Sequence, residues 1–168
     1  MPSFNNFAGI EKYLLKVLAD CMNEVGGKVD DLLKEHVQKD VYDVGTSLGR
    51  DYYHNGSSSP TGQLRDSVTH SKPTTSGNEV STEVHHDSSQ MDYNPDTYLH
   101  GSNYWSPNDV RDMLPYLIDS GNTGGLFGSV WEGLRRPYFT NTYNELVSKD
   151  LVKKWMMEAL KKRGLNVV

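Results

Sequence analysis

Apolar residues recur at spacings of three and four through the first quarter of the chain. Between residues 7 and 44 they fall mostly on one helical face, beginning with Ile10, Leu14 and Val17. This period predicts one long amphipathic helix. Gly26-Gly27 interrupts its middle at a cost of about 1 kcal/mol per glycine relative to alanine, so we expect a bend or a break there. Unbroken, about 35 residues would span about 50 Å, which is long for a small domain.

Two later segments alternate between apolar and polar positions, which is the two-residue period of a strand. They are residues 63–71 and 79–86, and the segment 72–78 between them is rich in turn-forming residues. A hairpin is the simplest pairing.

Two further strands are expected after a long polar and aromatic segment. Residues 116–121 form a short apolar run that ends in glycine, and residues 135–139 form an extended stretch in which Pro137 allows only an edge position. Ser106-Pro107 is a helix-start signal, and it predicts a short helix that ends near Leu114.

The end of the chain shows helix period again. Thr142 and Glu145 have the spacing of a capping box, which predicts that the final helix opens there. Its apolar positions include Trp155, and Gly164 stands where a helix commonly ends.

Together these elements predict an α+β fold: a long N-terminal helix, a small, mainly antiparallel four-stranded sheet with a long inserted loop at about 87–115, and a C-terminal helix packed on the sheet. A chain of 168 residues is expected to form one domain, residues 1–168.

The net charge and the cysteine count exclude several classes of protein and site. The formal charge is −5, which argues against a dedicated nucleic-acid-binding protein. The single cysteine, Cys21, excludes a disulfide framework and a cysteine-based zinc site. We see no signal peptide and no membrane span, so the protein is expected to be made in a reducing cytoplasm.

No group of residues predicts a catalytic centre, so we expect neither an enzyme nor a cofactor. His85, His86 and Asp92 form the most metal-like cluster, but their spacing matches no zinc pattern and adjacent histidines on a strand point to opposite faces. Gly121-x-x-Gly124-Gly125-x-x-Gly128 lacks the lysine and the fold context of a phosphate-binding loop. A small metal-dependent hydrolase using the histidine cluster stays open as an alternative function.

Several motifs, in their order along the chain, resemble one family. After the amphipathic helix come Pro60-Thr61-Gly62-Gln63-Leu64-Arg65-Asp66-Ser67-Val68, then Tyr116-Leu117-Ile118-Asp119-Ser120-Gly121, then Arg136-Pro137-Tyr138-Phe139 before the last helix. This set is similar to the tail-completion or head–tail joining proteins of tailed double-stranded DNA bacteriophages. The chain departs from the family pattern in a longer, more aromatic segment at 88–114 and in Asn141-Thr142, where the pattern has Pro-Ala.

The resemblance implies a structural protein of the phage neck. Copies would form a sixfold or twelvefold ring between the portal or adaptor on the head side and the tail terminator or tail tube on the other. Genomic DNA would pass through the ring without specific binding, and no membrane would be involved.

An assembly protein works through exposed surfaces, and certain side chains suit such contacts. Arginine pairs well with carboxylates at interfaces, and aromatic tips suit partner contacts. The residues expected at a subunit or partner interface are Arg65, Tyr104, Trp105, Asp119, Leu126, Phe127, Arg135 and Arg136. A host-interaction module that uses Tyr98, Tyr104 and Trp105 is a further alternative.

Overall fold

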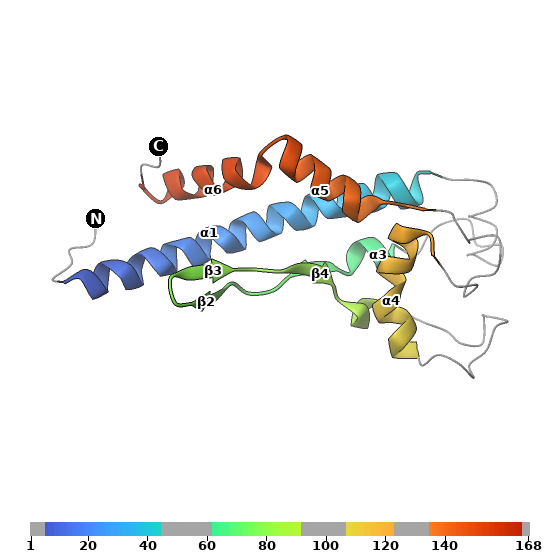
Figure 1. The fold of residues 1–168 in the computed structure, drawn as a ribbon, viewed down its shortest axis with the longest axis horizontal. Coiled ribbons are helices and arrows are strands. Elements are labelled where there is room, and N and C mark those ends of the chain that lie inside the picture. Colours follow the sequence, from blue (N-terminus) through green and yellow to red (C-terminus); the bar gives the residue numbers. More distant parts are fainter. Residues whose placement is uncertain (1–5, 45–61, 92–106, 123–134, 166–168) are drawn as a thin grey trace. The chain divides into compact units, whose positions relative to one another are not determined.

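The computed structural model describes residues 6–44, 62–91, 107–122 and 135–165 (Figure 1). The chain divides into two compact units. The first contains Met1–Asp31, Thr69–His85 and Glu145–Val168, and the second contains Leu32–Val68 and His86–Asn144. The fold is α+β, as predicted from the sequence, and it is mostly helical.

The N-terminal segment is the long helix that its period predicts. Helix α1 covers Phe7–His36 and continues as the π-helix η1, Val37–Tyr42. It runs through Gly26-Gly27 without the expected break. A Cβ atom at position 26 would lie 2.7 Å from Cδ2 of His70, so Gly26 is needed for the close approach of that ring.

The core of the first unit lies between α1 and the C-terminal helix α6, Leu151–Lys162. Val17 and Cys21 of α1 are buried against Ala159 and Leu160 of α6. The prediction that the C-terminal helix packs on the sheet is therefore wrong, because its most buried side chains meet the apolar face of α1. Burial raises the pKa of the Cys21 thiol, as expected for an inert core cysteine.

The strands form two separate sheets of two strands rather than one sheet of four. Strand β1, Val68–His70, pairs with β4, Val84–His86, and β2, Thr74–Ser76, pairs antiparallel with β3, Glu79–Ser81. In the second pair, Thr75 lies opposite Val80. The predicted hairpin between 63–71 and 79–86 is thus correct in its pairing, but part of the expected turn is strand β2.

The predicted strand at 63–71 begins too early. Gln63–Asp66 form a helical turn, α3, which Gly62 precedes with a φ of +82°. The amide of Asp66 donates to the carbonyl of Gly62 at 2.9 Å, and that of Ser67 donates to Gln63 at 2.9 Å. The alternation of apolar and polar residues did not distinguish one helical turn from the start of a strand.

Both strands predicted after residue 115 are also wrong. Helix α4 covers Pro107–Ser120 and includes Pro115, so residues 116–121 are its last turns and the glycine that ends it. Gly121 has a φ of +71°. Residues 135–137 are irregular, and helix α5, Tyr138–Ser148, begins immediately after them.

The predicted capping box lies inside α5. Thr142 Oγ1 donates to the carbonyl of Tyr138 at 2.7 Å, so this hydroxyl bonds back to the preceding turn and does not cap a helix start. Asp150, with a φ of +52°, separates α5 from α6. Gly164 ends α6 as predicted, since its φ is +78° and the amide of Leu165 donates to the carbonyl of Leu160 at 3.1 Å.

Candidate interaction surface

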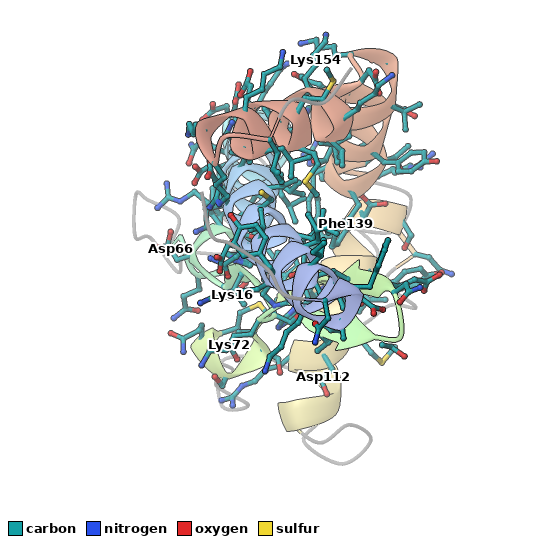
Figure 2. The ribbon with its side chains drawn as sticks, turned by 90° about the vertical axis from the view of Figure 1, so that its left-hand side faces the viewer. Lys16, Asp66, Lys72, Asp112, Phe139 and Lys154 are labelled. Atoms are coloured by element: carbon teal, nitrogen blue, oxygen red, sulfur yellow. The ribbon has the colours of Figure 1, made fainter. Side chains whose placement is uncertain are left out.

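Large apolar side chains are exposed on two helices of the second unit. Met113 and Tyr116 of α4 are 37% and 64% exposed, and Phe139 and Tyr143 of α5 are 37% and 66% exposed. Spacings of three and four place each pair on one side of its helix. Figure 2 labels Phe139 on α5 and Asp112, the neighbour of Met113, on α4.

Asp119 joins the two exposed pairs. Its Oδ1 accepts a hydrogen bond of 2.8 Å from the amide of Phe139, at the open N-terminus of α5. The amide of Arg136 also donates to the carbonyl of Ile118 at 3.0 Å. Asp119 lies one turn beyond Tyr116 on α4, so this hydrogen bond ties the last turn of α4 to the first turn of α5. We call this surface the aromatic ridge: Met113, Tyr116, Asp119, Phe139 and Tyr143.

Buried aromatic residues support the aromatic ridge from behind. Tyr138 has no exposed surface, and its ring stacks on Phe139 with 4.8 Å between centroids. The Tyr138 hydroxyl donates to the carbonyl of Pro115 at 3.2 Å and also lies 3.2 Å from Nε2 of His86. Burial raises the pKa of Tyr138 well above its usual value, so the phenol keeps its proton for these hydrogen bonds.

His86 belongs to this supporting layer. Its Nδ1 lies 2.7 Å from Oγ of Ser67, a fully buried hydroxyl that also hydrogen-bonds the carbonyl of Leu64 at 2.9 Å. Both ring nitrogens of His86 therefore have protein partners. Of the cluster considered for metal binding, His85 is half-buried and Asp92 lies outside the described residues. In the described part of the chain, no group of three or more metal-ligating side chains is present.

The π-helix η1 carries a second set of polar contacts in the same unit. Oδ2 of Asp40 lies 2.8 Å from Nδ1 of the buried His36 and accepts a 2.9 Å hydrogen bond from Asn141 of α5. Burial raises the pKa of Tyr42. π-Helical turns recur at functional sites, but these side chains bond one another and fix α5 against the end of α1.

Arg65, one of the expected interface residues, is engaged within the unit. Its Nε donates to Asp66 at 2.9 Å and its Nη1 donates to Gln38 at 3.0 Å. The guanidinium hydrogen bond holds the pKa of the Asp66 carboxyl below its usual range. These contacts join α3 to η1, which gives Arg65 a structural role in addition to any partner contact.

The other expected interface residues divide into three groups. Asp119 lies within the aromatic ridge. Arg135 and Arg136 adjoin it, and Arg135 is exposed and donates to Thr140 at 3.2 Å. Tyr104, Trp105, Leu126 and Phe127 lie outside the described residues.

The four apolar members of the aromatic ridge were not predicted from the sequence. Their signal was present as helical spacing, at positions 113 and 116 and at 139 and 143. It was overlooked because 116–121 and 135–139 were interpreted as strands. Each pair was thereby divided between a predicted strand and a predicted helix, and its helical spacing was not recognised as one face.

Comparison with known proteins places the chain in a family. The family model named YomN matches residues 6–162, which is most of the chain. No curated protein and no solved structure matches. Within the described residues, no helix is long and apolar enough to cross a membrane. The chain therefore belongs to the YomN family, and this membership indicates that it is a phage-derived protein.

Proposed function

We propose that this protein is a structural component of a phage virion that forms a ring at the neck and joins the DNA-filled head to the tail. Its partners are other copies of itself, a portal or adaptor protein on the head side, and a tail terminator or tube protein on the tail side. Membership of a phage family supports a role in the phage particle.

The aromatic ridge is the observation that carries this proposal. Groups of large exposed apolar side chains commonly mark protein–protein contacts. Tyrosine, phenylalanine and methionine are enriched at the centres of such contacts, and charged residues are typical of their rims. The ridge has this composition, with Arg135 and Arg136 beside it, and its supporting layer is bonded in place before any partner arrives.

The sequence motifs that suggested the neck family support the proposal less directly. The second and third motifs were expected to be strands, but residues 116–120 and 138–139 are helical. Of the first motif, only its last residue, Val68, lies in a strand. The proposal therefore depends on the exposed surface and on the phage family rather than on a shared strand pattern.

The test compares ridge variants with a matched control. The double variant Tyr116→Ser/Tyr143→Ser removes two exposed rings, and Val152→Ser removes a 42% exposed apolar residue of α6 outside the ridge. Phages that lack the gene are complemented with each variant, and the heads joined to tails are counted by electron microscopy. We expect the ridge variant to keep native circular dichroism and to reduce joined particles at least tenfold, while the control supports normal numbers. Normal joining by a folded ridge variant would contradict the proposal.

A further inference from the structure

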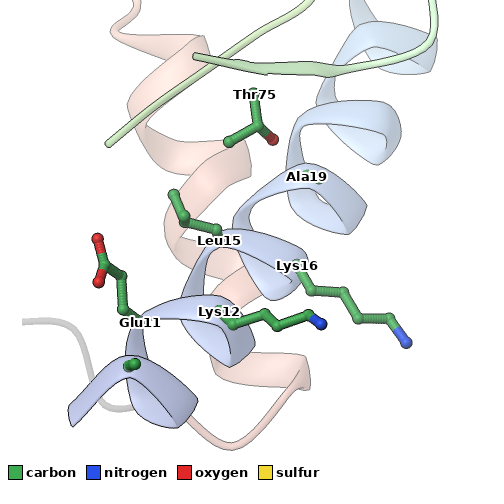
Figure 3. A pocket seen from close by; sticks show the side chains of 7 residues that line it. Glu11, Lys12, Leu15, Lys16, Ala19 and Thr75 are labelled. Atoms are coloured by element: carbon green, nitrogen blue, oxygen red, sulfur yellow. The ribbon is translucent and has the colours of Figure 1, made fainter. Parts of the chain in front are cut away.

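A shallow groove of about 370 Å³ lies on the first unit, along the N-terminal part of α1 and beside strand β2 (Figure 3). Its lining residues are Ala8, Glu11, Lys12, Leu15, Lys16, Ala19 and Thr75. All but Thr75 come from three turns of one helix, so the groove is a face of α1 that the β2–β3 hairpin only borders.

The two sides of this face carry opposite charge. In Figure 3, Glu11 points to one side of α1, and Lys12 and Lys16 point to the other. All three side chains are exposed, and none has an ion-pair partner among the residues that the structure describes. Lys28 and Glu24, further along the same helix, are by contrast paired with Glu158 and Lys162 of α6. The charges beside the groove are thus available to another molecule.

Exposed apolar residues flank Glu11. Phe7 is 89% exposed and Leu14 is 40% exposed, and with Glu11 they have the four- and three-residue spacing of one helix face. This stripe continues the one that α6 covers at Val17 and Cys21. We call Phe7, Glu11 and Leu14 the acidic side of α1, and Lys12 and Lys16 its basic side.

We propose that the acidic side of α1 in one copy binds the basic side of α1 in the next copy. The Glu11 carboxylate would pair with the ammonium groups of Lys12 and Lys16, and Phe7 and Leu14 would pack along the methylene chains of these lysines. The small side chains of Ala8 and Ala19, which line the groove beside the lysines, let a neighbouring helix approach. A second copy fits better than an unrelated partner because each side supplies the charge that the other lacks.

The two sides lie on nearly opposite faces of the helix, because successive residues turn by about 100°. A contact between different surfaces of identical chains is heterologous, so it repeats from copy to copy and closes into a ring or continues as a filament. It does not end at a dimer. The inference therefore rests on the proposed ring assembly and names one of its subunit contacts, separate from the aromatic ridge.

Two charge reversals test the contact by mixing. Glu11→Lys makes both sides of α1 basic, and Lys12→Glu/Lys16→Glu makes both sides acidic. Each variant alone places like charges in the contact, whereas a mixture places a basic side against an acidic side at every junction. Lys153→Glu, at an exposed position of α6, is the matched control. Self-association is measured by sedimentation equilibrium at low salt, up to the highest soluble concentration.

The expected result is at least tenfold weaker self-association for each variant alone, and recovery to the wild-type level in the equimolar mixture. Native mass spectrometry of the mixture should show equal numbers of the two variants in each assembly. Three results would each overturn the inference: variants that alone associate as strongly as wild type, a mixture that fails to associate, or wild-type protein that does not self-associate at all. If the variants associate normally while the ridge variant fails to join heads to tails, only this contact is refuted and the proposed function stands.

Discussion

Two adjacent glycines in α1 occupy different surroundings. A Cβ atom at Gly26 would lie 2.7 Å from Cδ2 of His70, and this ring is held by Nδ1 against Asp30 Oδ2 at 2.5 Å. A Cβ atom at Gly27 would lie 4.0 Å from Cε1 of the same ring, an ordinary van der Waals distance. Position 26 therefore requires glycine, whereas position 27 tolerates a side chain.

We predict that Gly26→Ala lowers the free energy of unfolding by about 1–3 kcal/mol, since the held ring must move. Gly27→Ala should raise it by up to about 1 kcal/mol, because alanine is the better helix former. Urea unfolding of the two variants beside wild type measures both changes. Equal effects of the two substitutions would mean that His70 does not pack against α1 at Gly26.

The Tyr138 hydroxyl is the link between α5, α4 and the sheet residue His86. Tyr138→Phe removes the hydrogen bonds to Pro115 and His86 at a fully buried position, so we expect a loss of about 1–3 kcal/mol of stability. Tyr143→Phe, at a 66% exposed position of the same helix, should change stability by less than about 0.5 kcal/mol. Thermal unfolding of both variants compares them, and a neutral Tyr138→Phe would show that this hydroxyl is not bonded as described.

The ion pairs of Glu24 make the stability of the fold depend on pH in the acid range. Hydrogen bonds from Lys162 and Arg163 of the C-terminal segment lower its pKa below the usual 4.5. A carboxyl with a lowered folded-state pKa stabilises the fold above its unfolded pKa, and this contribution is lost as the pH falls through the folded value. We predict that Glu24→Gln is less stable than wild type at pH 7 and that the difference shrinks below about pH 4. A difference in stability that is unchanged between pH 7 and pH 3 would contradict the assignment.

At the scale of elements, the first unit depends on the packing of α6 against α1. Leu160 is 9% exposed and lies in the core with Val17 and Cys21, so Leu160→Ala should cost about 2–5 kcal/mol. Trp155 is only half-buried, with Nζ of Lys28 5.6 Å from its ring centroid, so Trp155→Ala should cost less than Leu160→Ala. Denaturant unfolding measures the loss of unfolding free energy for both variants. A larger loss for Trp155→Ala would mean that α6 turns Trp155, rather than Leu160, toward α1.

Helix α1 was predictable because its period holds over 30 residues, and a pattern of that length fits only one element. The helical state of residues 116–121 was not predictable, because six apolar and polar residues fit a buried strand and the end of a helix equally well. Pro115 was interpreted as a helix end, but α4 accommodates it at the loss of one backbone hydrogen bond. The same error hid the aromatic ridge, because each of its residue pairs was divided between a predicted strand and a predicted helix.

At the scale of the whole molecule, two exposed surfaces stand on separate units. The aromatic ridge lies on the second unit, and the oppositely charged sides of α1 lie on the first. In the proposed assembly, α1 binds copies of the chain and the aromatic ridge binds a different partner. This arrangement suits a ring subunit that must also join the structures on either side of it.

The measurement that tests this account most directly is the number of copies of this chain in each purified, DNA-filled phage particle. Quantitative mass spectrometry against a labelled standard of the full chain determines it. The account predicts a fixed number of copies per particle that matches a sixfold or twelvefold ring, with density for them where the head meets the tail. Particles that are complete and infectious yet contain no copies of the chain would contradict it.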